Sequence, residues 1–266
     1  MRRRTVAILV SAFCFSVLTA KPGKAQSGPP TGEKAPPNER ATAPQVSPEE
    51  QAEAYLARKD YREAAAAYKA LAEKYPNNAS YLNKLGMAYQ QLDYMSAAAK
   101  SYEHAIKLEP NFVEAWNNLG TVYYSRKKFG KAIHTYQKAV SLRPDMAVLY
   151  SNLGYAYFSD KKYEESIAAF RKVLEIAPEY FEQTGSRNAP LLQNRSVENR
   201  GRFYFMLAKS FAQANNVERC LHYLRKAREE GYKELATVRT DPAFAAVVND
   251  PGVQDLLAHP KDSATP

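Results

Sequence analysis

The chain has 266 residues, of which 45% are hydrophobic and 24% are charged, and its formal net charge is +9 at pH 7. Residues 1–25 hold five of the 37 basic residues and none of the 28 acidic ones, so the other 32 basic residues exceed the acidic ones by only four. Because the sequence also lacks a basic stripe with interleaved aromatic residues, its charge argues against nucleic acid as a partner.

The N-terminus has the pattern of a secretory signal peptide over residues 1–25. Three arginines at positions 2–4 precede an apolar run over residues 6–20, and Ala25 offers a cleavage site. This run of 15 residues is shorter than the roughly 20 that a membrane-spanning helix needs. We therefore expect a periplasmic or secreted protein. The alternative is an inner-membrane protein anchored by residues 6–20, and membrane contact is expected only through this segment.

Two further segments are predicted to be disordered. Residues 26–46 form a proline-rich linker with almost no large apolar residues, and residues 260–266 form a short tail. Such a composition cannot bury enough apolar surface to fold alone. The linker is expected to act as a tether, stiffened by its prolines.

A 34-residue repeat occupies the middle of the chain. Gly86, Gly120 and Gly154 are each preceded by a leucine and followed three residues later by a tyrosine. Each unit also has a small residue, then an aromatic residue, and closes on a proline. These positions are Ala98, Ala132 and Ser166; Tyr102, Tyr136 and Phe170; and Pro110, Pro144 and Pro178. Because the apolar residues of each half unit share one helical face, every unit is predicted to be a helical hairpin that ends at its proline.

The repeated glycine is predicted to mark a close contact between the two helices of a hairpin. A glycine within a helix costs about 1 kcal/mol relative to alanine. Its return three times in phase suggests that a methyl group would hold the helices apart.

These positions resemble the tetratricopeptide repeat family, in which Trp, Leu-Gly, Tyr, Ala, Phe, Ala and Pro recur. The unit over about residues 113–146 matches this pattern nearly completely, with Trp116, Leu119 and Gly120 in place. The resemblance implies an all-α fold, a right-handed α-solenoid of helix-turn-helix hairpins. It covers roughly residues 45–234, with units 1–4 over residues 47–180.

A fifth, degenerate unit is expected over residues 201–234 if 20 residues are inserted before it. The inserted loop spans residues 181–200 and is interpreted as structural, with a role in the groove as the alternative. Asp241-Pro242 and Asp250-Pro251 are typical helix starts, so two short helices are expected within residues 235–259. They are predicted to cap the last repeat.

The sequence contains none of the residue patterns that indicate catalysis. Its four histidines are scattered, with no His-Glu-x-x-His run and no Cys/His set for a metal. No phosphate-binding glycine loop or Gly-x-Ser-x-Gly motif occurs. Cys220 stands where other units carry a small buried residue, so it is interpreted as a packing residue. We expect no enzyme activity, no cofactor and no metal.

The resemblance implies that the first helix of each unit lines a concave groove, and this places the candidate partner-binding residues. They are Asn83, Lys84, Asn117, Asn118, Tyr124, Ser151, Asn152, Tyr155 and Phe158. Asn118 and Asn152 resemble the asparagine ladder of some family members, since a side-chain amide can both donate to and accept from a peptide backbone. Bonding within their own hairpin is the alternative. Tyr124, Tyr155 and Phe158 could form an aromatic strip, although buried packing accounts equally well for Tyr155.

The predicted function is that of a non-catalytic scaffold of the cell envelope or secreted space. Its partner would be a peptide or a segment of a protein bound in the groove. The alternatives are an envelope enzyme subunit, or a membrane-tethered assembly factor that uses the repeats to dock its partners.

Overall fold

The computed structural model describes residues 46–181 and 197–259. The predicted signal peptide, nearly all of the linker, most of the inserted loop and the C-terminal tail lie outside these residues. Every regular element in the described ranges is a helix. None of these helices is both long enough and apolar enough to cross a membrane.

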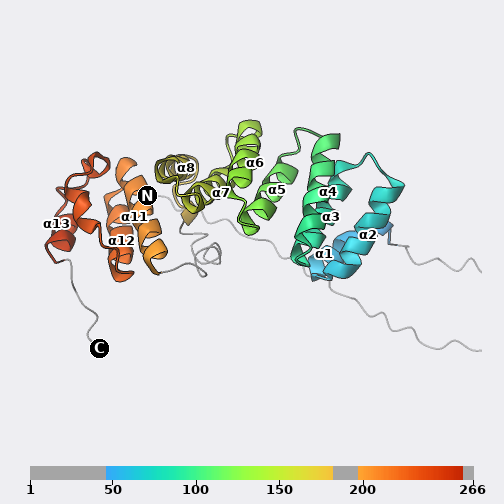
Figure 1. Ribbon diagram of the computed structural model, residues 1–266, viewed down its shortest axis with the longest axis horizontal. Coiled ribbons are helices and arrows are strands. Elements are labelled where there is room, and N and C mark those ends of the chain that lie inside the picture. The colour runs from blue at the N-terminus through green and yellow to red at the C-terminus, as the bar shows by residue number, and fades with distance from the viewer. Residues whose placement is uncertain (1–45, 182–196, 260–266) are drawn as a thin grey trace, which may run out of the picture. The chain divides into compact units, whose positions relative to one another are not determined.

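The helices form five consecutive antiparallel hairpins (Figure 1). They are α1(Pro48–Arg58) with α2(Tyr61–Lys74), α3(Ala79–Gln91) with α4(Met95–Leu108), α5(Val113–Ser125) with α6(Phe129–Leu142), α7(Ala147–Ser159) with α8(Tyr163–Ile176), and α11(Val197–Gln213) with α12(Val217–Glu229). Each helix packs mainly against its neighbours in the chain. This confirms the all-α solenoid of helical hairpins.

One residue with a left-handed backbone makes the turn inside every hairpin. These residues are Lys59, Asp93, Lys127, Lys161 and Asn215, with φ between 54° and 64°. The next residue donates its N–H to the carbonyl five positions back, as Lys128 does to Tyr123 at 2.8 Å, which closes the end of the first helix. The first four turns are 34 residues apart. Asn215 comes 20 residues later than that spacing, so the predicted insertion has the right length.

The repeated glycines lie directly against an aromatic ring of the second helix. A Cβ atom built on Gly86 would lie 2.6 Å from Cε1 of Tyr102, and one on Gly120 would lie 2.6 Å from Cε1 of Tyr136. At Gly154 the distance to Phe170 would be 2.5 Å. Since real Cβ atoms do not approach carbon this closely, the predicted close contact is confirmed and its partner is the aromatic residue of the same unit.

The repeated tyrosines join each hairpin to the one before it. Tyr123 of α5 donates its hydroxyl to Glu103 of α4 at 2.9 Å. Tyr157 of α7 accepts from Nε2 of Gln137 on α6 at 2.8 Å. The Leu-Gly-x-x-Tyr pattern therefore combines a contact within a hairpin with a contact between hairpins.

Short segments after α12 cover the last hairpin. They are the 3₁₀ helices η1(Leu235–Arg239) and η2(Pro242–Phe244) and the helix α13(Pro251–Ala258). Oδ1 of Asp250 accepts from the N–H groups of Gly252 and Val253 at 2.8 and 3.2 Å, so the predicted cap is present. The first predicted helix is only a 3₁₀ turn, because its backbone turns again at Asp250 before a second helical turn can form.

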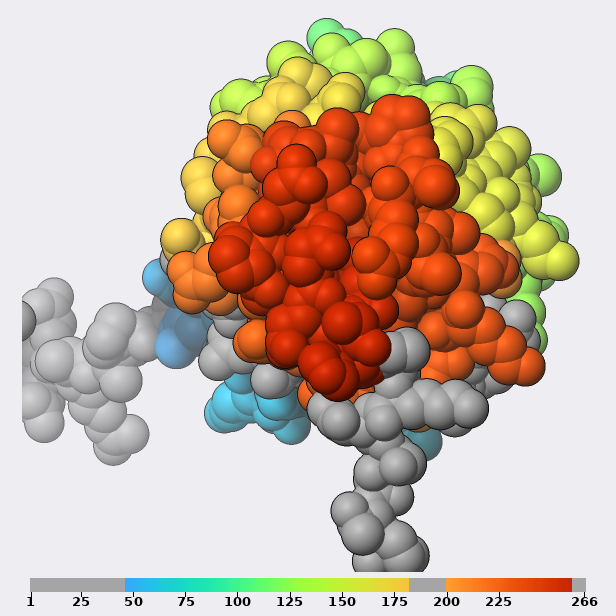
Figure 2. Space-filling view, turned by 90° about the vertical axis from the view of Figure 1, so that its left-hand side faces the viewer, coloured from blue at the N-terminus to red at the C-terminus, as the bar shows by residue number. Residues whose placement is uncertain are grey.

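The core of this end of the chain combines residues of the fourth and fifth hairpins with those of the cap. Val238, Phe244 and Val253 are fully buried in the same cluster as Phe203 and Leu224. Figure 2 looks onto this end, where red atoms of the last described residues lie at the centre of the face. The cap therefore shields the apolar surface that an exposed last repeat would leave in water.

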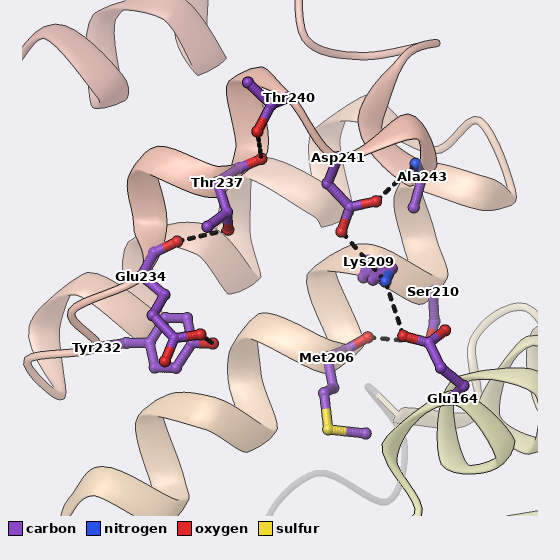
Figure 3. A network of polar contacts seen from close by, with 10 residues as sticks. All are labelled: Glu164, Met206, Lys209, Ser210, Tyr232, Glu234, Thr237, Thr240, Asp241 and Ala243. Atoms are coloured by element: carbon purple, nitrogen blue, oxygen red, sulfur yellow. Dashed lines mark hydrogen bonds and ion pairs between the residues drawn. The ribbon is translucent and has the colours of Figure 1, made fainter.

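A buried lysine also ties the cap to the repeats (Figure 3). Nζ of Lys209 on α11 lies 3.1 Å from Glu164 on α8 and 3.1 Å from Asp241 before η2. Burial lowers the pKa of Lys209, but the hydrogen bonds to these two carboxylates outweigh it and raise the pKa above its ordinary value. One ammonium group thus links the fourth hairpin, the fifth hairpin and the cap.

Candidate functional site

The asparagines of the predicted ladder bond to one another between neighbouring hairpins. Nδ2 of Asn118 on α5 donates to Oδ1 of Asn83 on α3 at 3.1 Å. Nδ2 of Asn152 on α7 donates to Oδ1 of Asn117 on α5 at 2.8 Å. These bonds join the first helices of successive units, so they differ from the alternative of bonding within one hairpin.

One half of several ladder amides is left over by these bonds. Among the described residues, Oδ1 of Asn118, Oδ1 of Asn152 and Nδ2 of Asn117 make no hydrogen bond. All three side chains are half-buried, whereas Asn83 is buried. The amides are therefore held in place by their neighbours and still present two acceptors and a donor.

The ladder ends at the fourth hairpin. Ser151 occupies the position of Asn83 and Asn117, but its hydroxyl is buried and has no partner in the described part of the chain. The fifth hairpin has Met206 at the position of Asn118 and Asn152, and methionine cannot donate a hydrogen bond.

At the other end of the ladder, Lys84 takes the position of the first amide donor. It pairs with Glu53 of α1, and its ammonium lies 5.7 Å from the centre of the Tyr68 ring. Lys84 therefore also joins two successive hairpins, through an ion pair where the later units use amides.

The predicted aromatic strip is mostly core. Tyr155 and Phe158 are only 4% and 3% exposed. The ring of Phe203 on α11 stacks on Tyr155, with centroids 5.4 Å apart, and meets Phe158 edge-on at 5.5 Å. Tyr124 is half-buried beside Phe129, and its hydroxyl accepts from Ser159. Packing against α11 removes Tyr155 and Phe158 from the groove surface, because the fifth hairpin lies directly against the fourth.

A pocket of about 270 Å³ lies beside the ladder, between the first three hairpins. Its lining residues are Leu56, Tyr61, Met87, Gln90, Gln91, Tyr102 and Asn118. Met87 is 41% exposed, and Oε1 of Gln90 is fixed by the Tyr102 hydroxyl at 3.0 Å. The pocket combines apolar walls with amide groups, and Asn118 belongs to both the pocket and the ladder.

Most of this pocket is absent from the set of residues predicted from the sequence. Asn118 is the member that the prediction includes. Met87 and Gln90 lie on the same face of α3 as Asn83, so the 34-residue phase carries a signal for them. The contribution of α1 and of Tyr61 follows only from how the first hairpin packs.

Other groups show no arrangement for chemistry. The described residues contain no cluster of three or more His, Cys, Asp or Glu that could hold a metal ion. Cys220 is fully buried, as expected for a packing residue. Burial, with a smaller effect of Asp250, raises the pKa of its thiol to about 12, which leaves very little reactive thiolate at neutral pH.

Family models match four stretches of the chain. A model described as TPR repeat matches residues 95–125 and 120–161, and two described as tetratricopeptide repeat match residues 147–180 and 49–94. The matched stretches together run from residue 49 to residue 180, which is the first four hairpins. No curated protein matches the sequence.

Solved structures give the same picture of the fold. A crystal structure of MamA protein is 22% identical, covers 73% of this chain and 93% of its own, and has a TM-score of 0.51. A MamA structure from Desulfovibrio magneticus RS-1 is also 22% identical, covers 69% of this chain and 92% of its own, and has a TM-score of 0.51. At this level of identity the likeness concerns the fold alone.

Proposed function

Because the chain belongs to the tetratricopeptide repeat family, we propose that it is a non-catalytic scaffold that binds an extended segment of a partner protein along α3, α5 and α7. The family supports the general role of a protein-interaction scaffold. The site within it is proposed from the amide ladder and from the pocket that shares Asn118 with it.

The amide groups left over in the ladder suit a peptide backbone. An extended peptide offers N–H and C=O groups along its length, and these match the free acceptors of Asn118 and Asn152 and the free donor of Asn117. Because each amide is already held by the neighbouring hairpin, less side-chain entropy is lost on binding. Such contacts would recognise the backbone whatever its sequence.

The pocket would supply side-chain preference. Its volume of about 270 Å³ is below the range of roughly 300–1,000 Å³ that is typical of small-molecule sites, so it suits a side chain rather than a whole ligand. Leu56 and the flexible Met87 favour an apolar side chain. The single observation that carries the proposal is that Asn118 lines this pocket and also has a free acceptor.

The N-terminal pattern leads us to place this scaffold in the periplasm or outside the cell. An inner-membrane location through residues 6–20 is the alternative, and an envelope enzyme subunit or assembly factor would use the same groove to dock partners. Mass spectrometry of the mature N-terminus distinguishes the two locations, since a chain that keeps Met1 or Arg2 contradicts cleavage.

A peptide-library selection on the purified chain, followed by calorimetry with variants, tests the groove. Met87→Lys and Asn118→Ala are each expected to weaken a selected peptide by about tenfold or more, the effect of removing an interface hot spot. Val148→Lys is the matched control, because Val148 is also a partly exposed apolar residue but does not line the pocket. Equal affinity of the wild type, Met87→Lys and Asn118→Ala for every selected peptide would refute the proposal.

A further inference from the structure

The positive charge of the repeats is concentrated in the third hairpin. Residues 115–144 contain six basic residues and no acidic residue. Five of the six belong to one face of α6 and the turn before it, and we call them the α6 basic face. They are Arg126, Lys127, Lys128, Lys131 and Lys138, all exposed.

Basic residues elsewhere in the repeats are often neutralised, whereas those of the α6 basic face are not. Lys69 pairs with Glu73 in the first hairpin, and Lys172 pairs with Glu175 in the fourth. Among the described residues, no carboxylate lies within 4 Å of any basic group of the α6 basic face.

Carboxylates on the neighbouring elements do not compensate the α6 basic face either. Glu103 of α4 accepts from the Tyr123 hydroxyl, and Asp160 in the following turn pairs with Lys162. Asp93 in the preceding turn forms no ion pair with the face. The positive charge is therefore uncompensated on both sides.

The position of these charges is unfavourable for the helix that carries them. Lys128 is the N-cap residue of α6, makes no side-chain cap bond, and is followed by no acidic residue in the first turn. Lysines at the positive end of the helix dipole each destabilise it by a few tenths of a kcal/mol. Lys127 adds the strain of a left-handed backbone without glycine. Bound anions would relieve the repulsion.

We propose that the α6 basic face binds the anionic headgroups of a lipid bilayer. Four of its five basic residues are lysines, and no large apolar side chain of α6 or of its turn is strongly exposed. Protein interfaces are depleted in lysine and depend on buried aromatic or arginine anchors, which this face lacks. Clusters of four to eight lysines and arginines without such anchors are typical of surfaces that attract anionic lipid.

This surface is separate from the groove. Ala132, Tyr136 and Ala139 pack α6 into its hairpin, and Lys131 and Lys138 lie on the exposed side. The ladder residues Asn117 and Asn118 belong to α5. A chain held on a bilayer through α6 therefore keeps its peptide groove accessible.

Vesicle flotation of the full chain tests the proposal. Phosphatidylcholine vesicles are compared with vesicles that also contain phosphatidylglycerol, at low salt and at 1 M salt. The test variant and its matched control each replace four exposed lysines by glutamine, so that their net charge is equal. They are Lys127→Gln/Lys128→Gln/Lys131→Gln/Lys138→Gln, and Lys69→Gln/Lys74→Gln/Lys161→Gln/Lys172→Gln.

The wild type and the control are expected to bind the anionic vesicles at low salt, and the test variant to bind them between two and three orders of magnitude more weakly. This follows from a factor of about five per lysine near an anionic surface. At 1 M salt, where the Debye length is about 3 Å, binding is expected to be lost. Residues 1–45 are the same in all variants, so any contribution from them cancels.

Three results would overturn the proposal. They are equal losses in the test variant and in the control, no preference for anionic over neutral vesicles, and tighter binding of the α6 basic face to polyglutamate or to duplex DNA than to vesicles. Circular dichroism checks the fold. If the quadruple variant is unfolded, Lys131→Gln/Lys138→Gln is used instead, with an expected loss of about 25-fold.

Discussion

Replacing Gly120 by alanine should destabilise the third hairpin, although alanine is the better helix former. The added Cβ would lie 2.6 Å from Cε1 of Tyr136, where an ordinary contact needs at least 3.4 Å. The Tyr136 ring cannot easily move, because it is 3% exposed and its hydroxyl is 3.1 Å from that of Thr121. Overpacking costs about 1–3 kcal/mol, and the higher helix propensity of alanine returns about 1 kcal/mol. The expected net loss is about 1 kcal/mol.

Urea unfolding followed by tryptophan fluorescence measures this loss locally. The only tryptophan, Trp116, lies on α5 one turn before Gly120. The matched control is Gly130→Ala on α6, because nothing lies within 4 Å of a Cβ added there. This substitution should stabilise the protein by about 0.5–1 kcal/mol. The two substitutions are thus expected to have opposite signs.

A double-mutant cycle separates the clash from other effects of the substitution. Tyr136→Leu removes the ring atoms that the new methyl group would meet. In that background Gly120→Ala should become neutral or stabilising, which gives a coupling of about 1–2 kcal/mol. Additive effects, or a Gly120→Ala variant as stable as Gly130→Ala, would show that the ring contact does not explain the repeated glycine.

Three further predictions concern the turns, the cap and alkaline stability. Lys161→Gly should raise the unfolding free energy by about 1 kcal/mol because it removes left-handed strain, and Ala168→Gly on the exposed side of α8 should lower it by a similar amount in the same urea titration. Lys209→Met should lower it by about 1–2 kcal/mol, because Asp241 loses its ion-pair partner in a partly buried site, and thermal unfolding would show this. Burial raises the pKa of Tyr68 from 10.0 to about 12, so the stability it contributes is complete below pH 10 and lost as the pH rises towards 12; phenolate absorbance and circular dichroism should change together there, and separate transitions would contradict this.

The hairpins could be predicted from the sequence because their signals are local and periodic. The 34-residue phase placed the glycine contact and the boundaries of four units, and the 20-residue insertion placed the fifth turn at Asn215. Aspartate before proline placed the start of α13. Each of these depends on residues close together in the chain or exactly one repeat apart.

Contacts between hairpins were predicted less well, because they depend on how one unit is rotated against the next. The sequence gave no sign that Asn118 would bond to Asn83, or Asn152 to Asn117, across units. The burial of Tyr155 depends on Phe203, which lies beyond the insertion. The pocket at Asn118 needs three hairpins to be in place.

Whole-chain charge concealed the α6 basic face in the same way. The excess of four positive charges after residue 25 is ordinary when it is averaged over the chain. Residues 115–144 nevertheless carry six basic and no acidic residues, while the other hairpins pair many of their charges. A count per structural unit shows the concentration that a count per chain removes.

The third hairpin therefore carries the glycine contact, the centre of the amide ladder and the α6 basic face, and its variants should separate the two proposed surfaces. Lysine-to-glutamine changes on the exposed side of α6 leave Ala132 and Tyr136 in place, so the affinity of the groove for a selected peptide should stay unchanged. Gly120→Ala disturbs the packing that positions α5 and α6 together, and in a repeat protein such a change acts mainly on its own unit and its neighbours. Peptide affinity should then fall while vesicle binding persists, because charge attraction needs less exact geometry than paired hydrogen bonds. Loss of peptide binding in the lysine variants would mean that the two surfaces are one site.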